Sequence, residues 1–222
     1  MSINQLGRSM VEMLGVLAII GILSIGSIAG YQKATMKYKL NKQSQQLTQL
    51  LTTLHRYKAE WKFGQLQFVD LIPYYKKLGE IPQEMIKNIN SQDVIKDDKF
   101  KDHEVIFDVF HSSIQMRTNM CDPICTEVML VYYINKQNSF DICKNLALIG
   151  KELRNNIKML SSGKMTSSSS NTTYGPRYYG DGYCTKDVDC LSELTLDDIY
   201  EQCEYCTDSN AHCSYYFRFD MI

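Results

Sequence analysis

The chain has few residues of the kinds that enzymes place at reacting centres. Only four histidines occur among its 222 residues, and none stands in a serine-hydrolase, zinc-protease or phosphate-loop motif. The sequence alone establishes no pair of carboxylates for acid–base chemistry either. The histidines are His55, His103, His111 and His212. The sequence therefore predicts a protein that is not an enzyme and that binds no cofactor.

Charged residues are missing from a long stretch near the N-terminus. From Met13 to Gln32, 20 successive residues carry no charge. A helix of that length, rising about 1.5 Å per residue, spans roughly the 30 Å hydrocarbon layer of a bilayer. Residues 8–32 are therefore predicted to form a transmembrane helix. The alternative is a secretion signal cut after Ala29, but the apolar run is longer than the roughly 7 to 15 residues of such signals.

Helix-breaking residues are missing from the segment that follows. Neither proline nor glycine occurs between Tyr31 and Phe63. Apolar side chains recur there at spacings of seven, three and four, which is typical of an amphipathic helix. These positions are Leu40, Leu47, Leu50, Leu54, Tyr57 and Trp61. Residues 33–61 are therefore predicted to continue the helix and to lay this apolar stripe on the domain that follows.

One carboxylate, Glu12, borders the uncharged stretch. Burying an ionised carboxylate in lipid is costly, so such a residue is a functional candidate for which a partner must be sought. The alternative is that Glu12 lies in the headgroup region and is simply solvated.

Gly7, Glu12 five residues later and the apolar run that follows at once resemble the N-terminal segment of type IV pilins and of type II secretion pseudopilins. The resemblance implies that residues 1–7 are a leader, and that a prepilin peptidase cuts between Gly7 and Arg8 and methylates the new amine. It also implies that Glu12 neutralises the N-terminal amine of a neighbouring pilin subunit during assembly. The sequence departs from the family at Arg8, where an apolar residue is usual, and at Ala29, where many pilins carry proline.

Cysteine is missing from the first half of the chain. All eight cysteines lie in the second half, as expected for an exported domain stabilised by disulfides. They are Cys121, Cys125, Cys143, Cys184, Cys190, Cys203, Cys206 and Cys213. Lysines that follow the span, from Lys33 to Lys42, would by the positive-inside rule place the bulk of the chain in the cytoplasm. The cysteines and the resemblance together favour the periplasm instead.

The cysteines have other interpretations. Cys203, Cys206 and Cys213 with His212 are enough soft ligands for one zinc ion, but a second tight ligand pair is missing. A redox Cys-x-x-Cys pair is a further alternative. Disulfides are favoured, although eight cysteines allow about 105 pairings. Local bridges between Cys121 and Cys125, Cys184 and Cys190, and Cys203 and Cys206 are the pairings guessed from proximity in sequence.

Residues 62–160 are predicted to form a globular α+β head. Strand-like runs rich in Val, Ile, Phe and Tyr are expected to build an antiparallel sheet against which the long N-terminal helix packs. They cover residues 104–110, 113–118, 127–134 and 211–219. A helix is expected at 140–153 and a short one from Pro82. Residues 161–183 are rich in Ser, Tyr and Gly and are predicted to be an exposed loop, with Asn171 as a glycan acceptor in the alternative interpretation.

Residues 184–222 form an acidic, cysteine-rich tail of the head, with nine Asp or Glu against two basic residues. Such a charge balance argues against nucleic-acid binding. Asp181, Asp187 and Asp189 are weak candidates for calcium ligands, but their spacing fits no EF-hand and a solvated acidic loop is favoured, so no metal is predicted.

The sequence thus predicts a type IV pilin-like filament subunit with a single inner-membrane span and a head in the periplasm. It would assemble into a pilus or a secretion pseudopilus, and as part of a pilus it would reach the cell surface. The competing hypothesis is an uncleaved, single-pass envelope protein with a disulfide-rich periplasmic domain.

Overall fold

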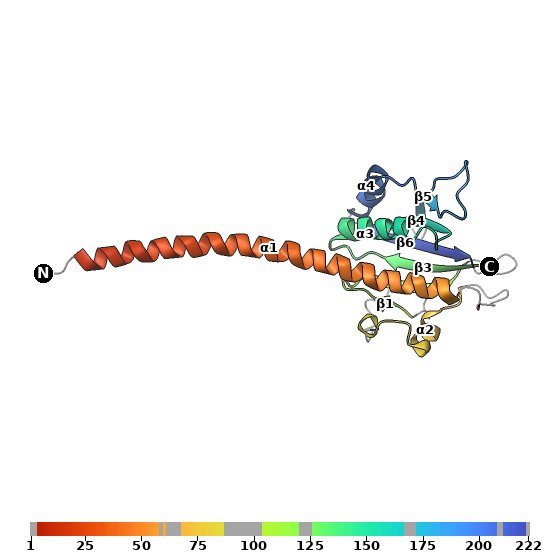
Figure 1. Cartoon of the computed structure of the whole chain (residues 1–222), viewed down its shortest axis with the longest axis horizontal. Coiled ribbons are helices and arrows are strands. Elements are labelled where there is room, and N and C mark those ends of the chain that lie inside the picture. Colours follow the sequence, from red (N-terminus) through yellow and green to blue (C-terminus); the bar gives the residue numbers. More distant parts are fainter. Residues whose placement is uncertain are drawn as a thin grey trace. The chain divides into compact units, whose positions relative to one another are not determined.

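A computed structural model describes residues 4–57, 60, 68–86, 104–119, 126–166, 172–207 and 211–220. The chain divides into two units, residues 1–41 and residues 42–222. We call the described part of the second unit the head. Figure 1 shows its helices and strands in chain order.

The first helix, α1, runs from Asn4 to Tyr57 and contributes to both units. Its part within the head carries the predicted apolar stripe. Leu47, Leu50 and Leu54 are buried, as expected, and Leu51 is buried beside them. Trp61, the predicted end of the helix, lies outside the described residues.

The head contains one six-stranded antiparallel sheet in the order β1-β2-β3-β6-β4-β5. The strands are β1 Ile106–Phe107, β2 Ser113–Thr118, β3 Glu127–Tyr133, β4 Met159–Thr166, β5 Thr172–Tyr179 and β6 Ala211–Asp220. The expected strands at 113–118, 127–134 and 211–219 are confirmed to within one residue. The expected strand at 104–110 is reduced to two residues.

The predicted loop at 161–183 is wrong for most of its length. Ser161 to Thr166 belong to β4 and Thr172 to Tyr179 to β5, and β4 pairs with both β5 and β6. Serine, glycine and threonine at these positions suggested a loop, yet Ser161 and Ser162 lie opposite Tyr216 and Tyr215 of β6 and are buried. The tertiary pairing therefore overrides the weak strand propensity of this segment. Residues 167–171, with Asn171, lie outside the described residues.

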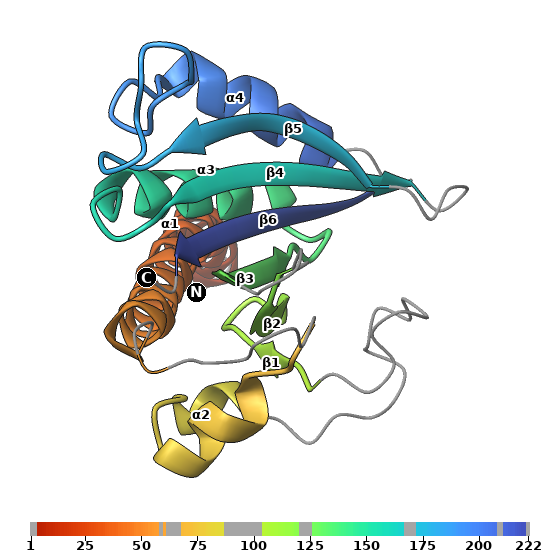
Figure 2. The same cartoon turned by 90° about the vertical axis from the view of Figure 1, so that its right-hand side faces the viewer.

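Helices cover one face of the sheet. The predicted helix at 140–153 is confirmed as α3, Ser139–Glu152, and α4 covers Leu196–Glu204. Cross-strand neighbours Tyr132 and Tyr215 are both buried on this face, Tyr132 against α1 and Tyr215 against α3 and α4. Figure 2 shows these helices behind the sheet.

Short helices complete the head. α2, Ile72–Leu78, ends at Gly79, whose φ of 72° is in the left-handed region that glycine adopts without strain. The short helix expected from Pro82 is the 3-10 turn η2, Gln83–Met85, and a second 3-10 turn, η4, covers Tyr205–Thr207. The protein is therefore α+β, with a long N-terminal helix packed on an antiparallel sheet.

Candidate functional site

The N-terminal part of α1 presents apolar side chains outward. Met10, Val11, Leu14 and Ile22 are each at least 65% exposed, and the apolar side chains between them are exposed as well. This stretch belongs to the one described helix that is long and apolar enough to cross a membrane. The assignment rests on length and composition, which a secretion signal near an N-terminus would also satisfy. An exposed apolar surface of this kind is unfavourable in water and is typical of a segment that contacts lipid or other protein.

The three residues singled out by the sequence all lie on this helix. The backbone of Gly7 and Arg8 is helical, and the Arg8 side chain is outside the described part. Glu12 is exposed among the apolar residues Val11 and Met13. Arg8 and Glu12 are four residues apart, so the two positions share one face of the helix. Glu12 is therefore an acidic group at the border of the apolar stretch, on the same helix face as the basic residue Arg8.

Within the head, α1 is held by a buried polar network that the sequence did not indicate. Gln43 Nε2 donates to Asp108 Oδ2 at 3.0 Å and to the Tyr132 hydroxyl, which itself donates to Asp108. Asn145 Nδ2 of α3 donates to Gln43 Oε1 at 2.8 Å. Four elements of the chain are therefore tied together at one residue of α1: the helix itself, the turn after β1, the strand β3 and α3.

Asp108 is the acceptor at the centre of this network. Besides the two side chains, the backbone N–H groups of Phe110 and Ser112 donate to its Oδ1 at 2.9 and 2.8 Å. Burial raises the pKa of Asp108, although its four hydrogen bonds favour the carboxylate. Burial likewise raises the pKa of Tyr132 well above its ordinary value. These groups are structural: they fix the rotation of α1 on the sheet.

Six of the eight cysteines are described, and all six form disulfides. The pairs are Cys143–Cys203, Cys184–Cys190 and Cys206–Cys213. The guessed bridge Cys184–Cys190 is confirmed, and the guessed bridge Cys203–Cys206 is wrong. Cys203 faces α3 rather than its neighbour Cys206, because α4 packs its buried side against α3. Cys121 and Cys125 lie outside the described residues.

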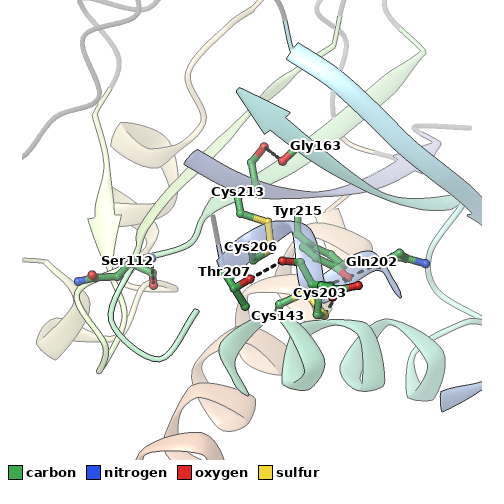
Figure 3. The surroundings of a disulfide bond; sticks show 12 residues. Ser112, Cys143, Gly163, Gln202, Cys203, Cys206, Thr207, Cys213 and Tyr215 are labelled. Carbon is green, nitrogen blue, oxygen red and sulfur yellow. Dashed lines mark hydrogen bonds between the residues drawn. A yellow bond between two sulfur atoms is a disulfide. The ribbon is translucent and has the colours of Figure 1, made fainter. Parts of the chain in front are cut away.

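Two of these bridges surround Tyr215, as Figure 3 shows. The Tyr215 hydroxyl lies 3.5 Å from Cys143 Sγ and donates to Gln202 Oε1 at 3.1 Å. Burial raises the pKa of this tyrosine. With Cys203, Cys206 and Cys213 all in disulfides, the zinc interpretation has no thiolates left to use.

The three calcium candidates do not gather into one site. Asp181 forms an ion pair with Arg154, Oδ2 to Nε at 2.9 Å. Asp187 and Asp189 border an open, polar surface hollow together with Arg177 and Lys186. In the described ranges, no three His, Cys, Asp or Glu side chains are placed to hold one metal ion.

Comparison with known proteins gives no further identification: no protein-family model, curated protein or solved structure matches this chain.

Proposed function

We propose that this chain is a type IV pilin-like filament subunit. Residues 8–32 hold it in the inner membrane, with the head in the periplasm. A prepilin peptidase removes residues 1–7 by cutting between Gly7 and Arg8, and methylates the new amine. Homologous subunits then associate through their N-terminal helices into a pilus or secretion pseudopilus. The proposal assigns the chain no catalysis.

One observation carries this proposal: Glu12 is the acidic residue at the start of an exposed apolar helix, five residues after Gly7. In a nonpolar surrounding its carboxylate needs a cation. The amine created by cleavage on a neighbouring subunit provides one. At about 4 Å and an effective dielectric constant of about 20, the two charges attract by about 4 kcal/mol before their desolvation is subtracted. The attraction exists only when the amine and the carboxylate meet, so it favours the register of the helices that pairs them over the others.

The architecture of the head supports the same proposal. The C-terminal part of α1, residues 42–57, belongs to the head and is fixed on the sheet by apolar burial and by the Gln43 network. The disulfides suit an oxidising compartment outside the cytoplasm.

The first experiment is to measure the N-terminal sequence and intact mass of the protein from its native envelope, without reductant. A chain that begins at methylated Arg8 supports the proposal. A chain that begins at Met1 indicates the competing hypothesis, an uncleaved membrane anchor. A chain that begins near Gly30 indicates a secreted protein and excludes filament assembly through this helix.

The second experiment tests the charge at position 12. Glu12→Gln keeps the size of the side chain and removes its charge, whereas Glu12→Asp keeps the charge and serves as the matched control. We expect Glu12→Gln to lose incorporation into filaments while membrane insertion and the near-ultraviolet circular dichroism of the head are unchanged. Glu12→Asp should retain part of the incorporation. Normal incorporation of Glu12→Gln would remove the assembly role assigned to this carboxylate.

A further inference from the structure

The outer side of α4 exposes two neighbouring apolar side chains. Leu196 is 67% exposed and Tyr200 57%, and they lie four residues apart, on one face of the helix. The Tyr200 ring packs edge-on against Phe140 of α3, with 5.4 Å between the ring centroids, so the head holds it in place. Figure 2 shows α4 behind β5, the edge strand of the sheet. This edge of the head therefore offers an apolar stripe to a partner.

Carboxylates border this stripe. The sequence of α4 contains four acidic residues and no basic one. Asp198 accepts hydrogen bonds from Thr195 at the start of the helix. The other three, Asp197, Glu201 and Glu204, are exposed, and no described residue forms an ion pair with them. An anionic lipid surface would be repelled here, so the outer side of α4 fits a partner that is basic and partly apolar.

The chain itself carries such a surface in residues 31–39 of α1, which we call the stem. The stem contains three lysines and no acidic residue. Tyr31 is 74% exposed and Tyr38 66%, and they lie about two helical turns apart on one face. Lys37 borders this face and Lys33 lies one turn before it; both are exposed, and neither is paired with a described acidic residue. The stem is thus complementary to α4 in charge and in apolar character.

We propose that the outer side of α4 docks on the stem of a second copy of this chain. The two apolar side chains of α4 lie against the stem tyrosines, and the α4 carboxylates face the stem lysines. Complementary charges fix the register of such a contact and disfavour wrong partners. Because the two surfaces differ, a pair of copies leaves one stem and one α4 open, and the contact can repeat from copy to copy.

The small size of the contact sets where it can form. Two exposed apolar side chains bury far less than the roughly 1,000 Å² of an interface that is stable in solution. The copies must therefore be held side by side, which raises their effective concentration. The contact rests on the membrane insertion of residues 8–32 proposed above, but not on the cut after Gly7 or on Glu12. Glu12→Gln, which is expected to stop incorporation into filaments, should leave it in place.

The test is photocrosslinking of the full chain in its native envelope. One copy carries p-benzoylphenylalanine in place of Tyr200, and a co-expressed copy with a different affinity tag is the recipient. Covalent pairs that contain both tags are isolated, and mass spectrometry locates the crosslinked residue. We expect it within residues 31–39 of the recipient. The matched control carries the photoreactive residue in place of Tyr74, an exposed tyrosine of α2, and should give no crosslink to the stem.

Charge reversal tests the complementarity of the two surfaces. Lys33→Glu/Lys37→Glu in the recipient should lower the yield of the crosslink at least about fivefold, because like charges then meet. Asp197→Lys/Glu201→Lys in the photoreactive copy should do the same. The two reversals together should restore the yield, which misfolding of either variant could not do.

Four results would each overturn the proposal: no covalent pair of copies, a crosslink to another protein or another segment, equal crosslinks from the two photoreactive positions, or no recovery in the combined reversal. Extraction with sodium carbonate is measured on the same membranes. Release of the chain would show that residues 8–32 are not inserted, which removes the proposed membrane role and this contact with it. Retention of the chain without the crosslink overturns this contact alone.

Discussion

Removal of the Cys143–Cys203 disulfide is expected to destabilise the head more than removal of any other described disulfide. This bridge joins α3 to α4 across 60 residues of sequence, whereas Cys184–Cys190 closes a loop of only 6. A cross-link restricts the unfolded chain, and the lost loop entropy grows with the logarithm of the loop length. At 25 °C this relation gives about 4 kcal/mol for the long loop and about 2 kcal/mol for the short one.

The perturbation is the double variant Cys143→Ala/Cys203→Ala, and the matched control is Cys184→Ala/Cys190→Ala. Alanine leaves no reactive thiol and places no hydroxyl at Cys143 and Cys203, which are both fully buried. Both sulfur atoms of this bridge lose buried packing, whereas in the control pair Cys190 is buried and Cys184 is exposed, which widens the difference between the variants.

The assay is urea unfolding of the full chain in detergent micelles without reductant, followed by near-ultraviolet circular dichroism of the head. The free energy of unfolding should fall by at least about 2 kcal/mol more for the 143/203 variant than for the 184/190 variant. Equal losses for the two variants, or a larger loss at 184/190, would refute the reasoning from loop length.

Two further predictions concern the head. Since burial raises the pKa of Asp108 above its ordinary 3.8, the native state binds more protons than the unfolded state from that value up to the native pKa. The free energy of unfolding should therefore fall with rising pH over this interval, and the fall should be missing in Asp108→Asn; urea unfolding between about pH 4 and 8 measures both. A Cβ at Gly180 would lie 1.8 Å from the Ile157 carbonyl oxygen, whereas one at Gly182 meets nothing within 4 Å. Gly180→Ala should lower the free energy of unfolding by about 3 kcal/mol and Gly182→Ala by far less, and similar melting temperatures for the two would contradict the close approach.

Periodicity in the sequence was sufficient to predict a helix or strand wherever one face of that element is buried by apolar side chains. Leu47, Leu50 and Leu54 marked the face of α1 that packs on the sheet, and the runs of Val, Ile, Phe and Tyr marked β2, β3 and β6. It failed for β4 and β5, where small and polar residues carry no such pattern. Ser161 and Ser162 are held in a strand by hydrogen bonding to β6, which comes some fifty residues later in the chain.

The polar contacts within the head also could not be predicted from the sequence. From the sequence alone, Gln43 would be taken for a surface residue of a helix. Only the fold brings Asp108, Tyr132 and Asn145 into contact with it. The Cys143–Cys203 bridge also joins residues that no spacing rule connects.

The sequence by itself determined the uncharged helix and the position of Glu12 on it, because these depend on residues adjacent along one helix. The tertiary structure decided the disulfide pairing, the two additional strands and the buried anchor of α1. Each of these depends on groups far apart in the chain, whose meeting is fixed by the packing of the whole head and not by local preference.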